Sequence, residues 1–296
     1  GQPEIIEKAR KCEALGAEVI QLSVGPELFY TFLTILEQTG YFNASLYTPY
    51  AIAGVETLGY EIATQFREKF GKDPDAVVVT NAASPAIIAA SVGLSGLHMA
   101  SDTQFNKKSF TTGHTGFGMP FAMWPDRTDV PRSAARALRY MDRYVTINQG
   151  EVFYITEALA SLEGLEKGPA GNTALTAAFS LAQEMDKDEM IVVQETEYTG
   201  AGKHIQPQLS FARDNGIELL FGDPKDEIPG KNIIFPSHPS LIKAQDADLD
   251  HMRKSLIKSA LNNSKVTPND ADIVFLAEET NTNIDYVKSV VKELLS

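Results

Sequence analysis

The stretch DAVVVT, Asp75–Thr80, decides the fold class of this chain. Its four central residues are all apolar, with no alternation between apolar and polar positions, which predicts a strand buried on both faces. Strands of this kind occur in parallel sheets that carry helices on both faces. The sequence therefore predicts an α/β fold, in which the segments on either side supply the helices and the neighbouring strands.

Strand and helix patterns alternate along the rest of the chain, as expected for a parallel sheet covered by helices. The other short apolar patterns typical of strands cover residues 17–22, 144–147 and 190–194. Helical patterns cover residues 3–15, 26–39, 52–70, 151–161, 173–185, 268–279 and 283–295. Residues 96–120 are rich in Gly, Thr, Ser and His and have little helical periodicity, so we expect an irregular active-site or interface loop there.

The segment after Thr80 breaks this alternation. Only Asn81–Pro85 separates the first strand from Ala86–Val92, another apolar run with the pattern of a buried strand. Neighbouring parallel strands need a crossover of about a dozen residues or more. A hairpin would place an antiparallel pair with two apolar faces inside a parallel array. We therefore expect that residues are missing between positions 81 and 84.

Composition and charge narrow the class of protein. The chain has 296 residues, of which 43% are hydrophobic and 22% charged, as is usual for a soluble globular protein. Its net charge of -13 argues against nucleic acid or an anionic membrane as the main partner, because both attract basic surfaces. Cys12 is the only cysteine, and no apolar run is long enough to span a membrane, so we expect a cytoplasmic protein.

Three segments have the residue types of a ligand site. The motif GPAGNTAL, 168–175, opens a helix whose free backbone N–H groups could bind an anion or a polar ring. Asn172 or Thr173 could equally be an ordinary helix cap. The motif SFTTGHTGFG, 109–118, combines glycines with hydroxyl groups and His114, and QETEYTGAGKH, 194–204, follows a strand at the sheet edge where ligands usually bind.

Other common chemistries find no support in the sequence. The five histidines lack the spacing of a helical metal site, and a single cysteine cannot form a thiolate site, so we expect no metal. The chain has neither a Walker loop nor the G-x-S-x-G motif of a serine hydrolase.

Taken in order, these segments resemble the fold-type-II pyridoxal-phosphate enzymes, the family of cysteine synthase and threonine synthase. The segments that carry this resemblance are Glu4–Ile20, Ala53–Ile62, Asp75–Thr80, Lys108–Phe117 and Glu151–Leu181. The resemblance implies a parallel sheet with helices on both faces, like that of the tryptophan synthase β chain. It also implies a remnant of the smaller N-terminal domain at 1–45, the larger cofactor-binding domain at 46–235 and a helical extension at 236–296.

Three long stretches are similar to a thiolase branch of this family: Gly1–Tyr30, Leu94–Asp126 and Gln194–His204. This similarity implies cleavage of 2-amino-4-oxopentanoate by coenzyme A to acetyl-CoA and alanine, a step of ornithine degradation, with pyridoxal 5'-phosphate as cofactor. It implies that the chain is a catalytic β subunit with a small α subunit as partner, in an oligomer.

The family pattern also assigns roles to residues. The lysine that holds the cofactor as a Schiff base is expected N-terminal to Gly1, and the phosphate-binding glycine loop is expected at the junction that begins with Asn81. Relatives often have a serine where this chain has Ala170, so Asn172 or Thr173 is expected to contact the ring nitrogen, beside Gly171. The residues expected to contact the substrate are Thr112, Gly113, His114 and Tyr198, with the two hydroxyl side chains and the histidine orienting it or binding the developing oxyanion.

Two alternatives stay open at this point. One is another reaction on the same fold, such as β-elimination, β-replacement or a threonine synthase-like lyase reaction, which would not need coenzyme A. The other is a non-catalytic chain that keeps the fold without the cofactor lysine. Lys107 and Lys108 are candidates for a substitute lysine, although such a pair in a polar loop is usually solvated.

Overall fold

A five-stranded sheet forms the centre of the molecule. The computed structural model describes residues 3–21, 28–43, 49–80, 97–102, 138–139, 142–169, 171–195, 205–228, 230–264 and 267–295. The strands are β1 (Ala76–Thr80), β2 (Leu97–Asp102), β3 (Arg143–Ile147), β4 (Ile191–Gln194) and β7 (Gln245–Asp246). Their order is β4-β1-β2-β3-β7, in which the first four are parallel and β7 is antiparallel to β3. The α/β fold and the strands predicted at 75–80, 144–147 and 190–194 are confirmed.

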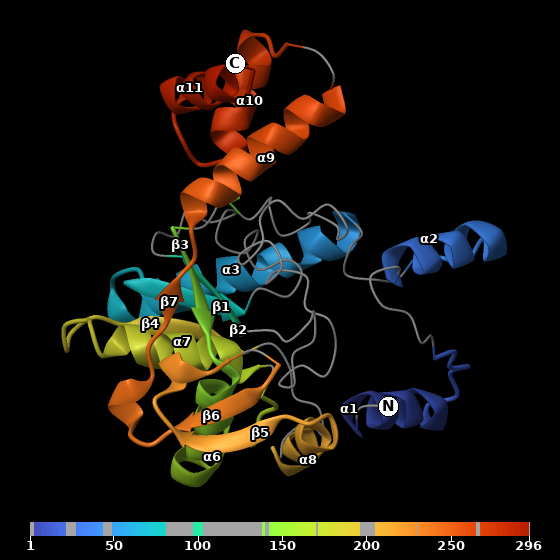
Figure 1. Cartoon of the computed structure of the whole chain (residues 1–296), viewed down its shortest axis with the longest axis vertical. Coiled ribbons are helices and arrows are strands. Elements are labelled where there is room, and N and C mark those ends of the chain that lie inside the picture. The colour runs from blue at the N-terminus through green and yellow to red at the C-terminus, as the bar shows by residue number, and fades with distance from the viewer. Residues whose placement is uncertain are drawn as a thin grey trace.

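Two helices build the main core against this sheet. They are α6 (Gln149–Glu163) and α7 (Asn172–Ala182), and α7 lies along the sheet (Figure 1). The small side chains of Ala174, Ala177 and Ala178 pack with the strand residues Val78 and Val145, so the helix approaches the sheet closely. Both helices confirm predicted segments.

A second, smaller parallel sheet lies on the other side of α6. It consists of β5 (Glu218–Gly222) and β6 (Asn232–Pro236), with α8 (Gln206–Asp214) beside it. Phe153 of α6 joins a cluster with Ile233 and Phe235 of β6, whereas its neighbour Val152 belongs to the core of the main sheet. The first half of α6 is therefore buried between two sheets. Two short 3-10 turns, η2 (Pro224–Asp226) and η3 (Pro239–Leu241), flank β6.

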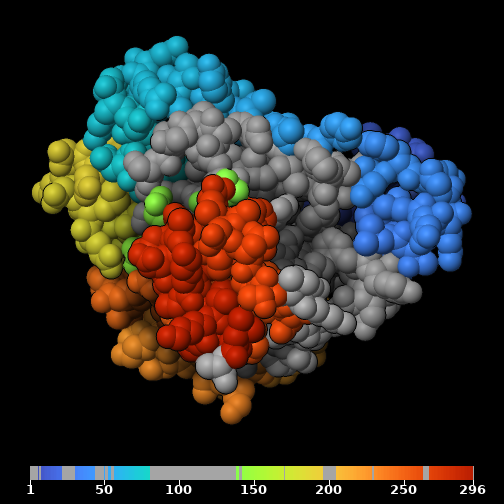
Figure 2. Space-filling model, turned by 90° about the horizontal axis from the view of Figure 1, so that it is seen from above, coloured from blue at the N-terminus to red at the C-terminus, as the bar shows by residue number. Residues whose placement is uncertain are grey.

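The C-terminal residues form a three-helix bundle. Its helices are α9 (Leu249–Ser264), α10 (Asp270–Glu279) and α11 (Ile284–Leu295). Ile257, Leu276 and Val287, one from each helix, meet in its core. In Figure 2 the bundle, in red, lies at the front of the molecule. The predicted helices at 268–279 and 283–295 are confirmed, and α9 is an additional helix.

The N-terminal helices α1 (Pro3–Ala14) and α2 (Leu28–Thr39) confirm two further predictions, as does the long helix α3 (Pro49–Phe70). The strand predicted at 17–22 is wrong, because residues 17–21 are irregular and Ile20 is 77% exposed. A strand needs a neighbour to complete its backbone hydrogen bonds. No described strand lies beside this segment to supply them.

The strand β2 corrects a second prediction, because it lies in the stretch 96–120 that we expected to be irregular. Its sequence LHMASD mixes apolar, small and polar residues, so it has no clear strand pattern. Its neighbours impose the structure, since β1 and β3 pair with it on both sides. The sixteen residues between Thr80 and Leu97 meet the usual crossover length for parallel neighbours. The apolar run 86–92 lies outside the described residues.

Candidate functional site

The candidate site lies at the edge of the main sheet where β1 and β4 end and α7 begins. The two strands are parallel neighbours, and Val79 is paired with Gln194. The next residues along are therefore Thr80 and Glu195. The hydroxyl oxygen of Thr80 accepts a hydrogen bond from the backbone N–H of Ala174 at 3.2 Å, which ties the first turn of α7 to this edge. Ligands of open α/β sheets usually bind at such carboxyl ends.

Asn172, the first residue of α7, is fully buried and has a fixed amide orientation. Its Nδ2 donates toward three oxygens: Thr156 Oγ1 at 3.1 Å, Gly168 O at 3.2 Å and Lys167 O at 3.4 Å. Because all three are acceptors here, the nitrogen must face them and Oδ1 must face away. Among the described residues, Oδ1 finds no hydrogen-bond donor. Buried polar atoms normally have partners, so this oxygen is an acceptor available to a ligand.

Thr173 repeats this feature one residue further on. It is 1% exposed, and its hydroxyl has no hydrogen-bond partner within the described part of the chain. Other buried helical threonines in this core donate to the carbonyl four residues back, as Thr156 does to Val152 and Thr176 to Asn172. Two adjacent residues at the start of one helix thus carry unsatisfied buried oxygens.

Glu195 adds a charge to this edge. Both of its carboxyl oxygens are buried, and neither has a hydrogen-bond partner in the described structure. Burial raises the pKa of Glu195, and the positive charge of Lys167 offsets this only in part. The register of β1 and β4 sets Glu195 next to Thr80, whose hydroxyl bonds the first turn of α7.

These groups form a concentrated set of hydrogen-bonding atoms with few partners of their own. The N-terminus of a helix adds free N–H groups and a partial positive charge. Burial excludes water and strengthens each polar contact that a ligand would make. The arrangement can therefore bind and orient a polar ring.

The structure describes three of the predicted site residues and brings them together. Gly171, Asn172 and Thr173 all lie at the start of α7. The other predicted site residues lie outside the described residues: Asn81, Thr112, Gly113, His114 and Tyr198. Thr80 was not predicted as a site residue, although it ends a predicted strand and ligands usually bind at the carboxyl ends of strands. Glu195 was not named individually, but it lies in the segment 194–204, which the same rule predicted as a ligand site.

Other kinds of function would need a metal site or a membrane-spanning helix. Across the described ranges, no group of three or more His, Cys, Asp or Glu residues could hold a metal ion. Among the helices that the structure describes, none combines the length and the apolar character needed to cross a membrane.

Comparison with known proteins gives consistent matches. The model of a family described as pyridoxal-phosphate dependent enzyme matches residues 2–197. A protein of Acetoanaerobium sticklandii named 2-amino-4-ketopentanoate thiolase beta subunit is 71% identical over 311 aligned positions, which cover 99% of this chain and 66% of that protein. A protein of the same name from an unknown prokaryotic organism is 61% identical over 312 positions, again with 99% and 66% coverage. The chain thus spans 66% of the length of these relatives.

Proposed function

Because this chain belongs to the family of pyridoxal-phosphate-dependent enzymes, we propose that the start of α7 and the ends of β1 and β4 form part of its cofactor site. We propose further that the whole protein cleaves 2-amino-4-oxopentanoate with coenzyme A to give acetyl-CoA and alanine. The names of its relatives support this reaction, and the high identity over 99% of the chain supports the transfer.

The residues at the sheet edge fit pyridoxal phosphate. The single observation that carries the proposal is the pair of buried oxygens without partners, Asn172 Oδ1 and Thr173 Oγ1. Leaving such atoms without partners costs about 1–3 kcal/mol each, and a polar ring that bonds them would remove that cost. Gly171, the N-cap residue of α7, has no side chain that would block close approach of a ligand.

The proposed chemistry needs a stabiliser for negative charge. When bound, the cofactor supplies an electron-withdrawing ring that stabilises negative charge on the amino-acid fragment as the C–C bond breaks. The described residues would hold and orient this ring, since Thr80 fixes the first turn of α7 and the buried edge excludes water. We assign substrate orientation and oxyanion contact to Thr112, His114 and Tyr198, with Gly113 allowing close approach.

The proposal also covers a partner subunit, a second substrate and cofactor-binding residues that lie outside this sheet edge. The name "beta subunit" of the relatives supports a small α subunit as partner in an oligomer, with coenzyme A as second substrate. We also propose a cytoplasmic location, a phosphate-binding loop at the junction that begins with Asn81, and a cofactor lysine outside the 296 residues.

Coenzyme A dependence tests the proposed reaction. Purified protein together with its small partner subunit is incubated with 2-amino-4-oxopentanoate and pyridoxal phosphate, with and without coenzyme A. We expect acetyl-CoA and alanine in equal amounts, and no cleavage without coenzyme A. Consumption of amino-acid substrates without coenzyme A would instead indicate an elimination or replacement enzyme.

Two variants connect the reaction to the described site. Asn172→Ala and Thr173→Val each remove one of the unsatisfied oxygens, and we expect each to weaken the binding of pyridoxal phosphate about tenfold. Ser161→Ala, in the exposed last turns of α6, is the matched control and should leave binding unchanged. A protein that binds no pyridoxal phosphate at all would be a non-catalytic chain of this fold.

A further inference from the structure

Helix α10 of the C-terminal bundle is apolar on two opposite faces. Ile273, Leu276 and Ala277 are buried in the core of the bundle. Val274 and Phe275 lie on the opposite face, where they are 43% and 52% exposed. A surface helix normally has one apolar and one polar face, and a helix that is apolar all round is normally buried. The outer face of α10 is therefore suited to contact another protein.

The outer face of α10 continues into a groove beside the start of α11. Val274 of α10 and Ile284 of α11 give the groove apolar walls, and Ile284 is 43% exposed. Glu278 and Asp285 also line it and add a carboxylate from each helix. We call these four residues, together with Phe275, the α10 face. An apolar centre with charges at its rim is typical of a protein–protein contact.

The charge of this region decides which kind of partner fits. Residues 267–287 contain no Lys or Arg and five acidic residues: Asp270, Asp272, Glu278, Glu279 and Asp285. In a symmetric dimer of this chain the α10 face would meet its own equivalent, so that like charges would oppose each other. A segment with apolar side chains between basic ones is complementary to both the apolar centre and the acidic rim.

The bundle is an addition to the enzyme domain of the family. The family model matches residues 2–197, so it ends before α9 begins at Leu249. The alignments with the two proteins named beta subunit cover 99% of the chain and therefore include the bundle. Figure 1 shows α10 and α11 at the end of the molecule opposite α8, where a partner can approach the bundle. The bundle thus occurs in relatives whose name implies a second subunit.

We propose that the α10 face binds the small α subunit, through a segment of that subunit that has apolar residues flanked by Lys or Arg. This inference rests on the partner subunit of the proposed function and assigns the surface that binds it. Val274, Phe275 and Ile284 supply the apolar contact, and Asp285 at the rim attracts the basic residues of the partner.

Two truncations of the α10 face test the apolar contact. Phe275→Ala and Val274→Ala remove exposed side-chain atoms, and alanine favours a helix over both residues, so α10 itself should stay folded. The dissociation constant of the complex between the purified whole protein and the small α subunit is measured by calorimetry. We expect Phe275→Ala to weaken binding about tenfold or more, and Val274→Ala to weaken it less. Phe70→Ala is the matched control, because Phe70 is a 42% exposed phenylalanine in α3, and it should leave binding unchanged.

Salt dependence tests the charged rim. We expect the complex to weaken as the salt concentration rises, because opposite charges at an exposed rim are screened. Asp285→Asn should weaken binding severalfold at low salt and make it less sensitive to salt. Asp214→Asn, which removes an exposed carboxylate from the end of α8, is the control and should change neither property.

The outcomes separate this surface from the proposed function. If the wild type binds the small subunit and both truncations leave the dissociation constant unchanged, the proposed partner stands and the α10 face is wrong. If the wild type does not bind the small subunit, the proposed partner fails and this inference fails with it. The proposed reaction is judged separately, by its dependence on coenzyme A.

Two further readouts identify a different occupant of the α10 face. A fall in melting temperature of Phe275→Ala, measured without the small subunit, that exceeds that of Phe70→Ala would show that another part of the same protein covers this face. A loss of self-association in sedimentation would show that a second copy does. Either result would overturn the proposal.

Discussion

Among single residues, two carboxylates bind the backbone at the start of α6. They belong to Glu151, in the helix itself, and to Glu227, which follows η2. Glu151 is 1% exposed, and its carboxylate accepts hydrogen bonds from the backbone N–H groups of Asn148 at 2.7 Å and Lys243 at 2.8 Å. Glu227 accepts from Gln149 and Gly150 at 3.2 Å. Two acidic side chains thus satisfy the free N–H groups at one helix start, as the helix dipole favours.

Burial nevertheless raises the pKa of Glu151 to about 7, and the negative charges of Glu227 and Asp223 raise it further. The two backbone hydrogen bonds act in the opposite direction but do not prevail. The folded protein therefore binds this proton more tightly than the unfolded chain does. The resulting contribution to the free energy of unfolding is complete below the ordinary pKa of 4.5 and is lost as the pH rises to about 7.

We predict that the free energy of unfolding falls between pH 4.5 and pH 7 by up to about 3 kcal/mol through Glu151 alone. Urea unfolding of the wild type and of Glu151→Gln across this range measures the effect. The variant should show a flatter dependence on pH, because it carries no titrating group at this position. Equal slopes for both proteins would contradict the assignment.

Among the secondary-structure elements, the contact between α6 and β6 depends on Gly150, because this residue has no side chain. A Cβ atom on Gly150 would lie 1.9 Å from the carbonyl oxygen of Ile234, and this oxygen belongs to the backbone of β6. The helix and the strand can therefore pack at this distance only with glycine at position 150. Glu227 strengthens the same contact, because its carboxylate also accepts from the N–H of Ile234 at 3.0 Å.

Gly150→Ala is expected to lower the free energy of unfolding by about 2 kcal/mol or more, since the helix must move away from β6. Gly54→Ala is the matched control, because Gly54 lies inside α3 and a Cβ there meets no atom within 4 Å. That control should raise stability by up to about 1 kcal/mol, as alanine favours a helix over glycine. Thermal or urea unfolding of both variants measures these changes. If Gly150→Ala left the free energy of unfolding unchanged, the close contact would be refuted.

Elements with a strong local pattern could be predicted from the sequence. The run AVVV predicted β1. Helix α6 ends at Glu163, and the next residue, Gly164, adopts the left-handed conformation typical of a helix stop. Elements that depend on distant neighbours could not. Strand β2 owes its structure to β1 and β3, and the apolar segment 17–21 has no strand partner in the described structure.

The candidate site was predictable only in part for the same reason. The helix start at Gly171–Thr173 is a local motif, so the sequence identified it. Glu195 becomes a site residue only because β4 lies next to β1, although more than a hundred residues separate these strands along the chain. Sheet order is set by tertiary packing, which local periodicity does not encode.

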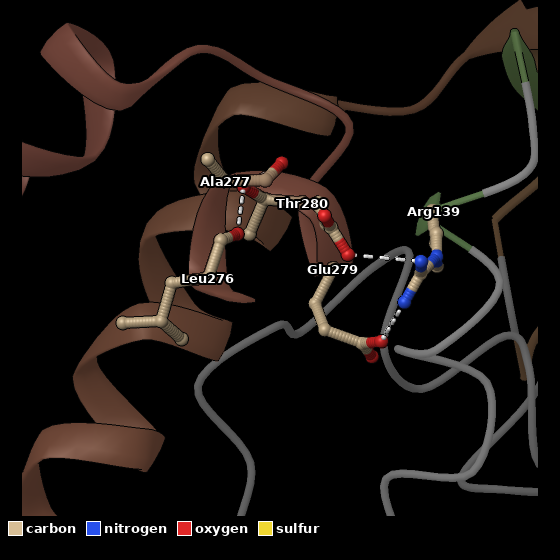
Figure 3. A network of polar contacts seen from close by, with 6 residues as sticks. Arg139, Leu276, Ala277, Glu279 and Thr280 are labelled. Carbon is tan, nitrogen blue, oxygen red and sulfur yellow. Dashed lines mark hydrogen bonds and ion pairs between the residues drawn. The ribbon is translucent and has the colours of Figure 1, made fainter. Parts of the chain in front are cut away.

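For the molecule as a whole, an ion-pair network connects the C-terminal bundle (α9, α10 and α11) to Arg139, which lies shortly before β3 in the chain. Arg139 Nη1 lies 2.9 Å from Glu279 Oε1 (Figure 3). Its Nη2 lies 3.0 Å from Glu278 Oε2. Beside these pairs, the buried hydroxyl of Thr280 donates to the carbonyl of Leu276 at 2.6 Å and closes the end of α10. Arg139 therefore contacts α10 at its last turn, next to this hydrogen bond.

We predict that Arg139→Met loosens the bundle, because it leaves the mostly buried Glu279 without its guanidinium partner. The free-energy change should be modest, about 1–2 kcal/mol, since Arg139 and Glu278 are partly exposed. Hydrogen exchange should become faster in α9, α10 and α11. Arg67→Met, which breaks the exposed pair with Asp73, is the control and should leave hydrogen exchange in the bundle unchanged. Equal effects of the two variants on exchange in the bundle would contradict the role of the Arg139 network.

The length of the alignments bears on the missing residues that we predict between positions 81 and 84. Each alignment is at least 15 positions longer than the 296-residue chain, so the relatives carry residues in the matched region that have no counterpart here. This supports the predicted gap without locating it. The crossover argument alone is weaker, because β5 and β6 are parallel and only residues 223–231 connect them.

Peptide mass mapping after borohydride reduction shows whether this chain is part of an enzyme that holds pyridoxal phosphate on a lysine. Reduction fixes the cofactor covalently onto the lysine that holds it. We expect a pyridoxyl-lysine on a peptide that is absent from the 296 residues, and no continuous peptide across positions 81–84. A pyridoxyl group on Lys107 or Lys108 would contradict the predicted position of the lysine. No adduct, with an intact mass that matches these residues alone, would show that the protein holds no cofactor on a lysine and would contradict the proposed reaction.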